Sequence, residues 1–504
     1  MNPFPRKRRP GIPRLSLIIG LLVLFLPSVL HAETASHVPE PPLWIVTPFL
    51  VLLLAIAVMP FINRHWWERF FPHVSIALGA ITTVYYILFL DGTHRMLHAG
   101  HEYVSFICLI GSLFVVAGGI HIRLRGYSTP LTNIVLLLFG AVLSNIVGTT
   151  GASMILIRPY IHNNKYRLHP YHIIFFIFIV SNMGGALTPI GDPPLFLGYL
   201  RGIPFFWVLF NLWGVWLFAI GSILAVFFLI DLRYYGKVPQ AVREEVIRVG
   251  EHAKFEGWHN IFFLAVILVA VFISTPPFLR EVLMLSAAAG SYYTTRPHIH
   301  RANHFNFFPI KEVGFLFLGL FATMVPALDW LELNSPSLGI VSASQFYWGT
   351  GFLSSFLDNA PTYLNFLSAE IGLFVTPNII AELQALIPAG FHADLTGRAT
   401  DIRLAFEALC RYHGDLVASG HVPLSDIQVS YLLAVHPLHV MAISIAAVFF
   451  GAMTYIGNAP NFMVRSIAEQ LGTRMPSFFG YMIRYSIPIL LPIFVLVWLI
   501  FFHG

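Results

Sequence analysis

The sequence predicts an all-α polytopic membrane protein of two inverted repeats, each with five transmembrane helices and one re-entrant hairpin, with discontinuous helices at the centre. Three observations lead to this prediction. The 504-residue chain is 57% hydrophobic and 11% charged, which leaves too little polar surface for a soluble globule. Apolar runs recur along almost the whole chain, and runs that cross about 30 Å of lipid must be helical. Similar Gly- and Pro-rich breaks interrupt one run in each half.

Residues 1–32 form either a signal peptide or an extra N-terminal helix. A basic "RKRR" precedes an apolar segment that ends at the small residue Ala32, although Leu30 departs from the small residue preferred before a cleavage site. Both interpretations leave residue 40 outside the cytoplasm. We expect a multi-pass protein of the bacterial inner membrane.

The first repeat covers residues 40–230. Its expected parts are full spans, a hairpin and a discontinuous helix: spans near 42–62, 73–91, 103–121 and 205–230, the hairpin at about 131–160 and the discontinuous helix at 171–199. The hairpin contains "LSNIVGTTGAS", and a continuous span should not carry Ser144, Asn145, Thr149 and Thr150 together unless the backbone turns.

The charged stretch 231–258 is expected to be a cytoplasmic linker, and the second repeat covers residues 259–504. Its parts are spans near 259–274, 281–295, 313–331 and 481–503, a hairpin at about 344–376 around "SSFLDNAPTY", an outer-face insert at 377–431 with one or two amphipathic helices, and a discontinuous helix at 432–462. Five crossings per half is an odd number, so the repeats are inverted. With both hairpins, most of the 29 Lys and Arg residues fall on the cytoplasmic side.

Several function classes are excluded by what the chain lacks. The net charge of +5 comes from basic residues scattered through short loops, so nucleic acid is not an expected partner. Cys108 and Cys410 offer neither a metal spacing nor a disulfide framework. No hydrolytic triad, phosphate loop or metal motif occurs, so we expect no enzyme and no cofactor.

The two breaks align residue by residue, "TPIGDPP" with "TYIGNAP". The matched pairs are Gly185 with Gly451, Thr188 with Thr454, Gly191 with Gly457, and Asp192 with Asn458. Glycines permit a non-helical backbone and prolines remove amide donors, so carbonyl oxygens are freed for a cation at membrane depth. The alternative is a pair of proline kinks repaired by neighbouring helices.

Asp192 and Asp358 are the most informative residues. An ionised aspartate at the bilayer centre costs at least about 2.5 to 3.5 kcal/mol. Neither hairpin tip nor broken helix contains a Lys or Arg, so the expected partner is a metal cation or a proton. The alternative is that both aspartates only cap helices. Neutral oxygens suited to Na⁺ or Li⁺ come from Ser144, Asn145, Thr188, Asn359, Thr362, Thr454 and Asn458, although each one alone is more often an interhelical hydrogen bond.

These motifs together resemble the ion transporter superfamily. The resemblance is to its NhaD-type sodium/proton antiporters and related arsenite permeases, with citrate and dicarboxylate carriers more distant. It implies a homodimer in which hairpins and broken helices carry substrate as an elevator. It also implies two Na⁺ sites, one at Ser144, Asn145, Gly185, Thr188 and Gly191 and one at Asp358, Asn359, Thr362, Gly451, Thr454 and Gly457. The chain lacks the threonine that dicarboxylate carriers place after "SN".

Three functional hypotheses remain open from the sequence. The first is an Na⁺(Li⁺)/H⁺ antiporter with elevator-like alternating access, with Na⁺ and H⁺ as the transported or coupling ions. The second is an Na⁺- or H⁺-coupled carrier of a small oxyanion such as arsenite, citrate or a dicarboxylate, held at half-helix N-termini. The third is a membrane receptor or scaffold, in which the paired breaks would be accidental.

Overall fold

The computed structural model describes residues 40–123, 128–239, 254–273 and 275–503. Within them, seven helices are long and apolar enough to cross a membrane, or nine if each of two sharply bent pairs is one span. The described strands, β1 (His121–Arg123) and β2 (Lys254–Glu256), are short and pair antiparallel. The prediction of an all-α polytopic membrane protein is confirmed. The predicted signal peptide or helix at 1–32 lies outside the described residues.

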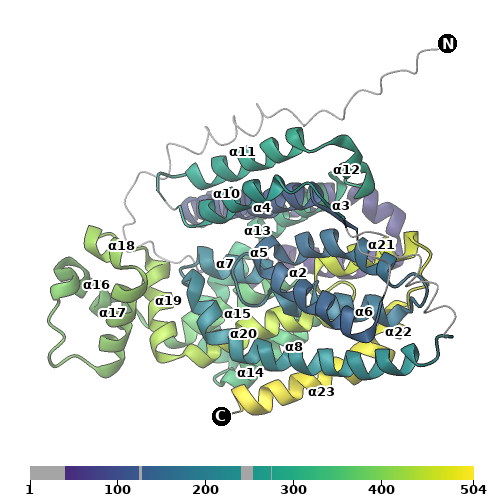
Figure 1. Cartoon of the computed structure of the whole chain (residues 1–504). Helices are drawn as coiled ribbons and strands as arrows, with labels where there is room; N and C mark the ends of the chain where they lie inside the picture. Colours follow the sequence, from purple (N-terminus) through teal and green to yellow (C-terminus); the bar gives the residue numbers. More distant parts are fainter. Residues whose placement is uncertain (1–39, 124–127, 240–253, 274, 504) are drawn as a thin grey trace, which may run out of the picture.

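One group of helices, the first layer, lies on one side of the molecule (Figure 1). It consists of η1 (Leu43–Val46), α2 (Thr47–Ile62), α3 (Arg64–Phe89), α4 (Thr93–Gly118), α10 (Asn260–Val271), α11 (Leu279–Thr294), α12 (Pro297–Ala302), α13 (Phe308–Asn334) and η3 (Ser335–Leu338). Helix α13 packs on α3 and α4, where Phe106 stacks on Phe317 with ring centroids 4.8 Å apart. The Ser75 hydroxyl donates to the Phe315 carbonyl oxygen at 2.7 Å.

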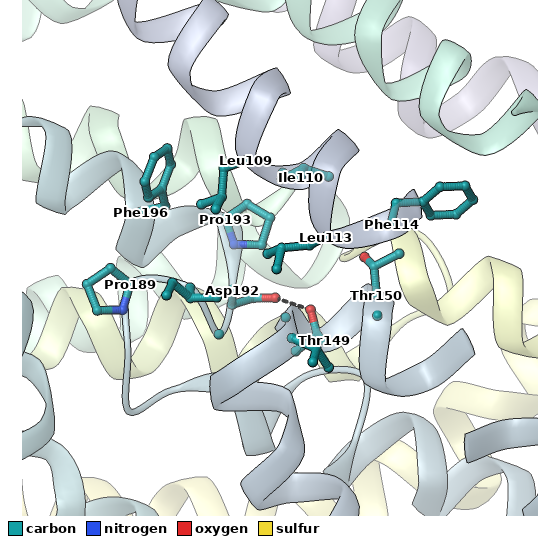
Figure 2. Close-up of a pocket in the computed structure, with 15 residues that line it drawn as sticks. Leu109, Ile110, Leu113, Phe114, Thr149, Thr150, Pro189, Asp192, Pro193 and Phe196 are labelled. Carbon is teal, nitrogen blue, oxygen red and sulfur yellow. Dashed lines mark hydrogen bonds between the residues drawn. The ribbon is translucent and has the colours of Figure 1, made fainter. Parts of the chain in front are cut away.

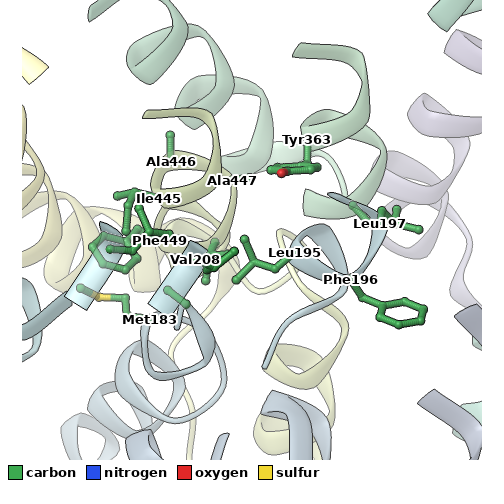
Figure 3. Close-up of a cluster of buried hydrophobic side chains, with 14 of the residues drawn as sticks. Met183, Leu195, Phe196, Leu197, Val208, Tyr363, Ile445, Ala446, Ala447 and Phe449 are labelled. Carbon is green, nitrogen blue, oxygen red and sulfur yellow. The ribbon is translucent and has the colours of Figure 1, made fainter. Parts of the chain in front are cut away.

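The other group, the second layer, contains all four motif segments. It consists of α5 (Pro130–Asn163), α6 (Pro170–Ile179), η2 (Met183–Gly185), α7 (Pro193–Leu200), α8 (Phe205–Tyr235), α14 (Ala343–Phe356), α15 (Asn359–Phe374), α20 (Pro437–Phe450), η5 (Gly451–Met453), α21 (Ala459–Gln470), α22 (Phe478–Tyr481), η6 (Met482–Ser486), α23 (Ile487–Val497) and η7 (Trp498–Phe502). Its core joins the two halves of the chain, since Met183, Leu195 and Val208 pack with Ile445 and Phe449 (Figure 3).

The insert forms a separate helical unit at one end of the molecule (Figure 1). Its elements are α16 (Pro377–Leu386), η4 (Ile387–His392), α17 (Thr400–Tyr412), α18 (Gly414–Ser419) and α19 (Leu424–Val435). The expectation of one or two helices is wrong, because four α-helices are present. Buried Ile402, Phe406 and Leu409 form an apolar stripe on α17, which packs on α19.

Several predicted span boundaries also change. Helix α4 begins at Thr93 rather than near 103, and α3 begins at Arg64 rather than near 73. The discontinuous helix expected at 432–462 begins at Pro437, after a 103° bend from α19. Helices α10 and α11 have 12 and 16 residues, so they rise only about 18 and 24 Å, less than the roughly 30 Å of a bilayer core.

The linker starts later than expected because α8 continues to Tyr235. Asp231, expected at the start of the linker, is fully buried in α8. Its carboxylate forms an ion pair with Arg167 and accepts hydrogen bonds from Tyr171 (2.7 Å) and Asn133 (3.1 Å). A buried, fully paired charge can remain inside a helix end, whereas an unpaired charge would not.

The two layers are joined by polar contacts near the end of α7. Arg201 Nε lies 2.7 Å from Glu102 Oε1 of α4, and Glu102 is buried. The Tyr199 hydroxyl donates to the Val271 carbonyl oxygen of α10 at 2.9 Å. The relation of the two halves by an axis in the membrane plane stays a prediction.

Candidate functional site

The first hairpin region folds back on itself. Helix α5 is interrupted at Gly148, whose φ of 76° and ψ of 157° are accessible to glycine and strained for other residues. Asn133 and Asn164 exchange two side-chain hydrogen bonds of 2.9 Å, although 31 residues of straight helix would separate them by about 46 Å. The two arms of α5 therefore lie side by side, with Gly148 at the tip.

The second hairpin region has the same shape with a different tip. Helices α14 and α15 are separated by Leu357 and Asp358 and pack on each other. The rings of Phe346 and Phe366, one on each arm, have centroids 6.2 Å apart. Ser342 caps α14 by accepting from the Gln345 amide, which fixes where the first arm begins.

Both broken helices leave helical geometry at the predicted residues. Between α6 and α7, a Cβ atom on Gly191 would lie 2.1 Å from the Gly185 carbonyl oxygen. Between α20 and α21, a Cβ atom on Gly457 would lie 2.7 Å from the Gly451 carbonyl oxygen. In each break the backbone crosses itself so closely that only glycine fits.

Thr188 and Thr454 make matching contacts with the two hairpins. The Thr188 hydroxyl donates to the Asn145 carbonyl oxygen at 2.6 Å, and the Thr454 hydroxyl donates to the Ser355 carbonyl oxygen at 2.6 Å. Each hydroxyl also accepts from the backbone amide three residues later at 3.1 Å. The aligned threonines therefore perform the same structural task in both halves.

Asp192 lies where the four motif segments meet. Its carboxylate, in a residue 1% exposed, accepts hydrogen bonds from the Thr149 hydroxyl (2.7 Å) and the Asn458 amide (3.0 Å). It also accepts from the Asn359 amide. The first of these contacts is visible in Figure 2. Although Asp192 is the N-cap residue of α7, its side chain makes no capping bond. The capping alternative does not describe Asp192.

The charge at Asp192 is balanced by neutral donors only. Among the described residues, no Lys, Arg or His forms an ion pair with Asp192 or Asp358. Three neutral donors stabilise a carboxylate but leave its charge uncompensated. Such a centre favours a cation or a proton as its missing partner.

Asp358 and its neighbours have a partly structural role. The Asp358 carboxylate accepts from the Ala360 amide at 3.0 Å, so it caps α15, as the alternative interpretation states. The Thr362 hydroxyl donates to the Asp358 carbonyl oxygen at 2.9 Å. The Asn359 Oδ1 atom is buried and has no hydrogen-bond partner. This oxygen is free to serve as a ligand.

Ser144 and Asn145 hold the first break in place. The Ser144 hydroxyl donates to the Val180 carbonyl oxygen at 2.7 Å. The Asn145 side chain donates to the Gly184 carbonyl oxygen at 2.7 Å and accepts from the Leu187 amide at 2.9 Å. These side-chain contacts correspond to the interhelical hydrogen bonds that the sequence left open as an alternative.

A small cavity lies beside Asp192, between the two layers. It has a volume of about 30 Å³, enough for a water molecule or a small ion. Leu109, Ile110 and Leu113 of α4 line one side, and the break around Asp192 with Thr149 of the first hairpin lines the other (Figure 2). Within the described part of the chain, no three His, Cys, Asp or Glu side chains are grouped as a metal site.

Sequence reasoning missed several residues of this centre. Thr149 was noted only as part of a polar break, yet it binds Asp192. Asn461 donates to the Gly451 and Thr454 carbonyl oxygens at 2.8 and 2.9 Å and accepts from Asn182 at 2.6 Å. The "NAPN" sequence already placed Asn461 one turn after Asn458, which could have indicated its role.

A helical membrane protein whose hairpins and broken helices converge on one buried carboxylate belongs to the class of secondary transporters. Residues 38–502 match a family model described as "Putative citrate transport", and the chain belongs to this family. The match agrees with the predicted permease superfamily, although it names citrate transport, which the motifs resembled more distantly. A comparison with curated proteins finds no match. A transport family is in general not enzymatic, in agreement with the expectation that the chain is no enzyme.

Proposed function

We propose that the protein is an Na⁺(Li⁺)/H⁺ antiporter that works by elevator-like alternating access. The observation that carries this proposal is the buried Asp192 carboxylate, which is contacted from both hairpins and from the second break but pairs with no basic side chain among the described residues. A carboxylate in this position can exchange a proton for a small cation, which is the minimal chemistry of antiport.

The elevator part of the proposal is supported by how the layers meet. All four motif segments belong to the second layer, and the cavity beside Asp192 opens against α4 of the first layer. Movement of the second layer against the first would carry this cavity with it. We further propose a homodimer in a bacterial inner membrane, which light scattering of the detergent-solubilised protein would test.

The ligands in this proposal come from the two sets of the sequence analysis. The first set is Ser144, Asn145, Gly185, Thr188 and Gly191, and the second is Asp358, Asn359, Thr362, Gly451, Thr454 and Gly457. Asp192 and Asn458, the aligned pair of the two breaks, complete the proposed ligands. Carboxylate and amide oxygens suit Na⁺, a hard ion that prefers oxygen ligands. Asn359 Oδ1 and the backbone carbonyls of the breaks supply oxygens in addition to Asp192.

A proton-flux assay on everted vesicles tests the proposal. Na⁺ should cause dequenching of a ΔpH dye with the wild type, and Asp192→Asn should reduce this signal about 10- to 100-fold, since one charged contact is worth about 1.5 to 3 kcal/mol. Asp394→Asn, at an exposed position of the insert, is the matched control and should behave as wild type. Full Na⁺-dependent dequenching in Asp192→Asn would contradict the proposal.

A second candidate, an Na⁺- or H⁺-coupled citrate carrier, is favoured by the family description. In such a carrier, the N-termini of α7 and α21 would have to bind the carboxylate groups of citrate. Pro193, Pro194 and Pro460 remove amide donors from these two ends, which weakens them as anion sites. Uptake of labelled citrate, compared with Na⁺, Li⁺, K⁺ and arsenite in the same proteoliposomes, separates the two candidates.

A further inference from the structure

Glu370, one turn before the end of α15, is fully buried and has no hydrogen-bond or ion-pair partner. Neither of its carboxylate oxygens has a hydrogen bond, and no ion pair reaches it from the described residues. The other buried acidic side chains of the described chain all have polar partners, namely Glu102, Asp192, Asp231, Glu281, Asp329 and Asp426. Glu370 therefore differs from these six residues in having no polar partner, so it does not hold helices together through a hydrogen bond or an ion pair.

An ionised carboxylate without a partner is strongly unfavourable in a dry interior, whereas a neutral carboxyl group is far less so. Glu370 is fully buried, so bulk water does not solvate it, and α15 with α16 forms one of the bent apolar pairs that could span the membrane. In the present conformation, Glu370 is therefore expected to carry a proton.

Glu370 belongs to a row of residues on one face of α15. Asn359, Tyr363, Glu370 and Phe374 follow one another at spacings of four, seven and four, which places them on the same side of a helix. At the deep end, Asn359 donates to Asp192. Tyr363 packs so closely on α7 that a Cβ atom at Gly198 would lie 2.4 Å from its hydroxyl.

The other end of this row meets two histidines. Phe374 stacks on His436, with ring centroids 3.9 Å apart, and contacts His439 at 5.0 Å. His436 lies in the bend between α19 and α20 and is only half-buried. Phe374 lies one helical turn beyond Glu370, so the row on this face of α15 ends at two imidazole side chains.

The titratable groups on the elements packed against α15 are otherwise engaged or neutral. They are Tyr199 of α7, Asp329 and Glu332 of α13, Tyr347 of α14, Asp426 and Tyr431 of α19, His439 of α20 and Tyr363 of α15 itself, while Lys311 and Glu312 lie at the beginning of α13, about five turns before Asp329. Asp329 and Glu332 pair with Arg95, and Tyr347 donates to the Phe494 carbonyl oxygen. None of them forms a hydrogen bond or an ion pair with Glu370, although Tyr363 lies close enough to interact with it electrostatically.

We propose that Glu370 is a proton-binding group of this transporter, in addition to the carboxylate of the cation centre at Asp192. The proposal deepens the proposed function and rests on transport being coupled to protons. In the step itself, H⁺ passes from a carboxyl oxygen of Glu370 to a water molecule that reaches it in another conformation, which leaves a carboxylate and a hydronium ion. Asp192 exchanges its proton for the cation, and Glu370 supplies a further proton to the opposing flux.

Two transport assays distinguish a proton-binding role of Glu370 from a role in translocation of the substrate. Substrate exchange across the membrane at equal pH needs no net proton movement, whereas net transport driven by a pH gradient does. In proteoliposomes, Glu370→Gln should lower gradient-driven net transport at least tenfold and leave exchange within about twofold of wild type. Glu382→Gln, the same change at an exposed position of the insert, should leave both modes unchanged. Net transport by Glu370→Gln with the wild-type pH profile would overturn the proposal.

Exchange by the wild-type protein tests the proposed function independently of the Glu370 variant. Exchange of Na⁺ supports the antiporter and exchange of citrate supports the second candidate, and the Glu370→Gln comparison is made with whichever substrate exchanges. If Glu370→Gln melts like the wild type yet loses exchange, Glu370 serves translocation itself and the proton assignment fails. If it does not fold, Glu370→Asp replaces it. A shifted pH profile then supports the proposal, and an unchanged profile refutes it.

Discussion

Replacing Gly191 by alanine should disrupt the centre without removing any of its ligands. The new Cβ atom would lie 2.1 Å from the Gly185 carbonyl oxygen and 2.8 Å from its carbon, and both are backbone atoms that cannot rotate away. In real structures a Cβ atom lies at least 3.0 Å from the backbone atoms of another segment. The segments at Gly185 and Gly191 must therefore separate by about 1 Å.

This displacement would break two bonds to the first hairpin. The Gly191 carbonyl oxygen accepts from the Thr149 amide at 2.8 Å, and the neighbouring Asp192 accepts from the Thr149 hydroxyl at 2.7 Å. An added 1 Å takes both beyond hydrogen-bond range. The expected cost is about 2.5 to 4 kcal/mol, summed from roughly 1 kcal/mol for the neutral bond and 1.5 to 3 kcal/mol for the charged one.

Thermal denaturation in detergent and transport in proteoliposomes should both register the change. Gly221→Ala is the matched control, because no atom lies within 4 Å of its new Cβ and the residue is exposed on α8. This control should be neutral or stabilising by up to about 1 kcal/mol. A Gly191→Ala protein that melts and transports like wild type would refute the close crossing of the two segments.

Three further predictions concern polar contacts, each measured by denaturation in detergent. Arg167→Ala should destabilise the protein by about 3 to 5 kcal/mol because the buried Asp231 carboxylate loses its ion-pair partner. Arg398→Ala, which removes an exposed ion pair, should cost less than about 1 kcal/mol, and equal losses in the two variants would contradict the prediction. Asn461→Ala should cost about 1 to 3 kcal/mol through the lost bonds to both breaks, and an unchanged melting temperature would argue against them. Arg201→Ala should destabilise by about 1 to 3 kcal/mol because Glu102 stays buried, and restoration by the double change Arg201→Ala with Glu102→Gln is the check.

The centre was predictable where a backbone rule forces the residue type. The six-residue spacing of Gly185 and Gly191 recurs in Gly451 and Gly457, and both pairs mark a crossing that excludes a side chain. The aligned Thr188 and Thr454 accordingly make equivalent hydrogen bonds. The sequence pattern identified these positions because no other residue could be accommodated there.

Contacts that need a partner from elsewhere in the chain were not predictable. The span expected near 103–121 left Glu102 outside it, but Arg201, 99 residues later, pairs with Glu102, and α4 begins at Thr93. Asp231 likewise stays in a helix because Arg167 reaches it. Ser355 accepts from Thr454 through its backbone carbonyl oxygen, as Asn145 does from Thr188. Because the two side chains differ, aligning the halves by residue type did not identify Ser355 as the equivalent of Asn145.

The donors around Asp192 have a consequence for biosynthesis. Thr149 is made before Asp192, but Asn359 and Asn458 emerge from the ribosome more than 150 residues later. Until then a nascent first half holds an acidic group in lipid with an incomplete set of partners. The insertion machinery must shelter this intermediate, and a chain truncated before the second hairpin should be a substrate for quality-control proteolysis.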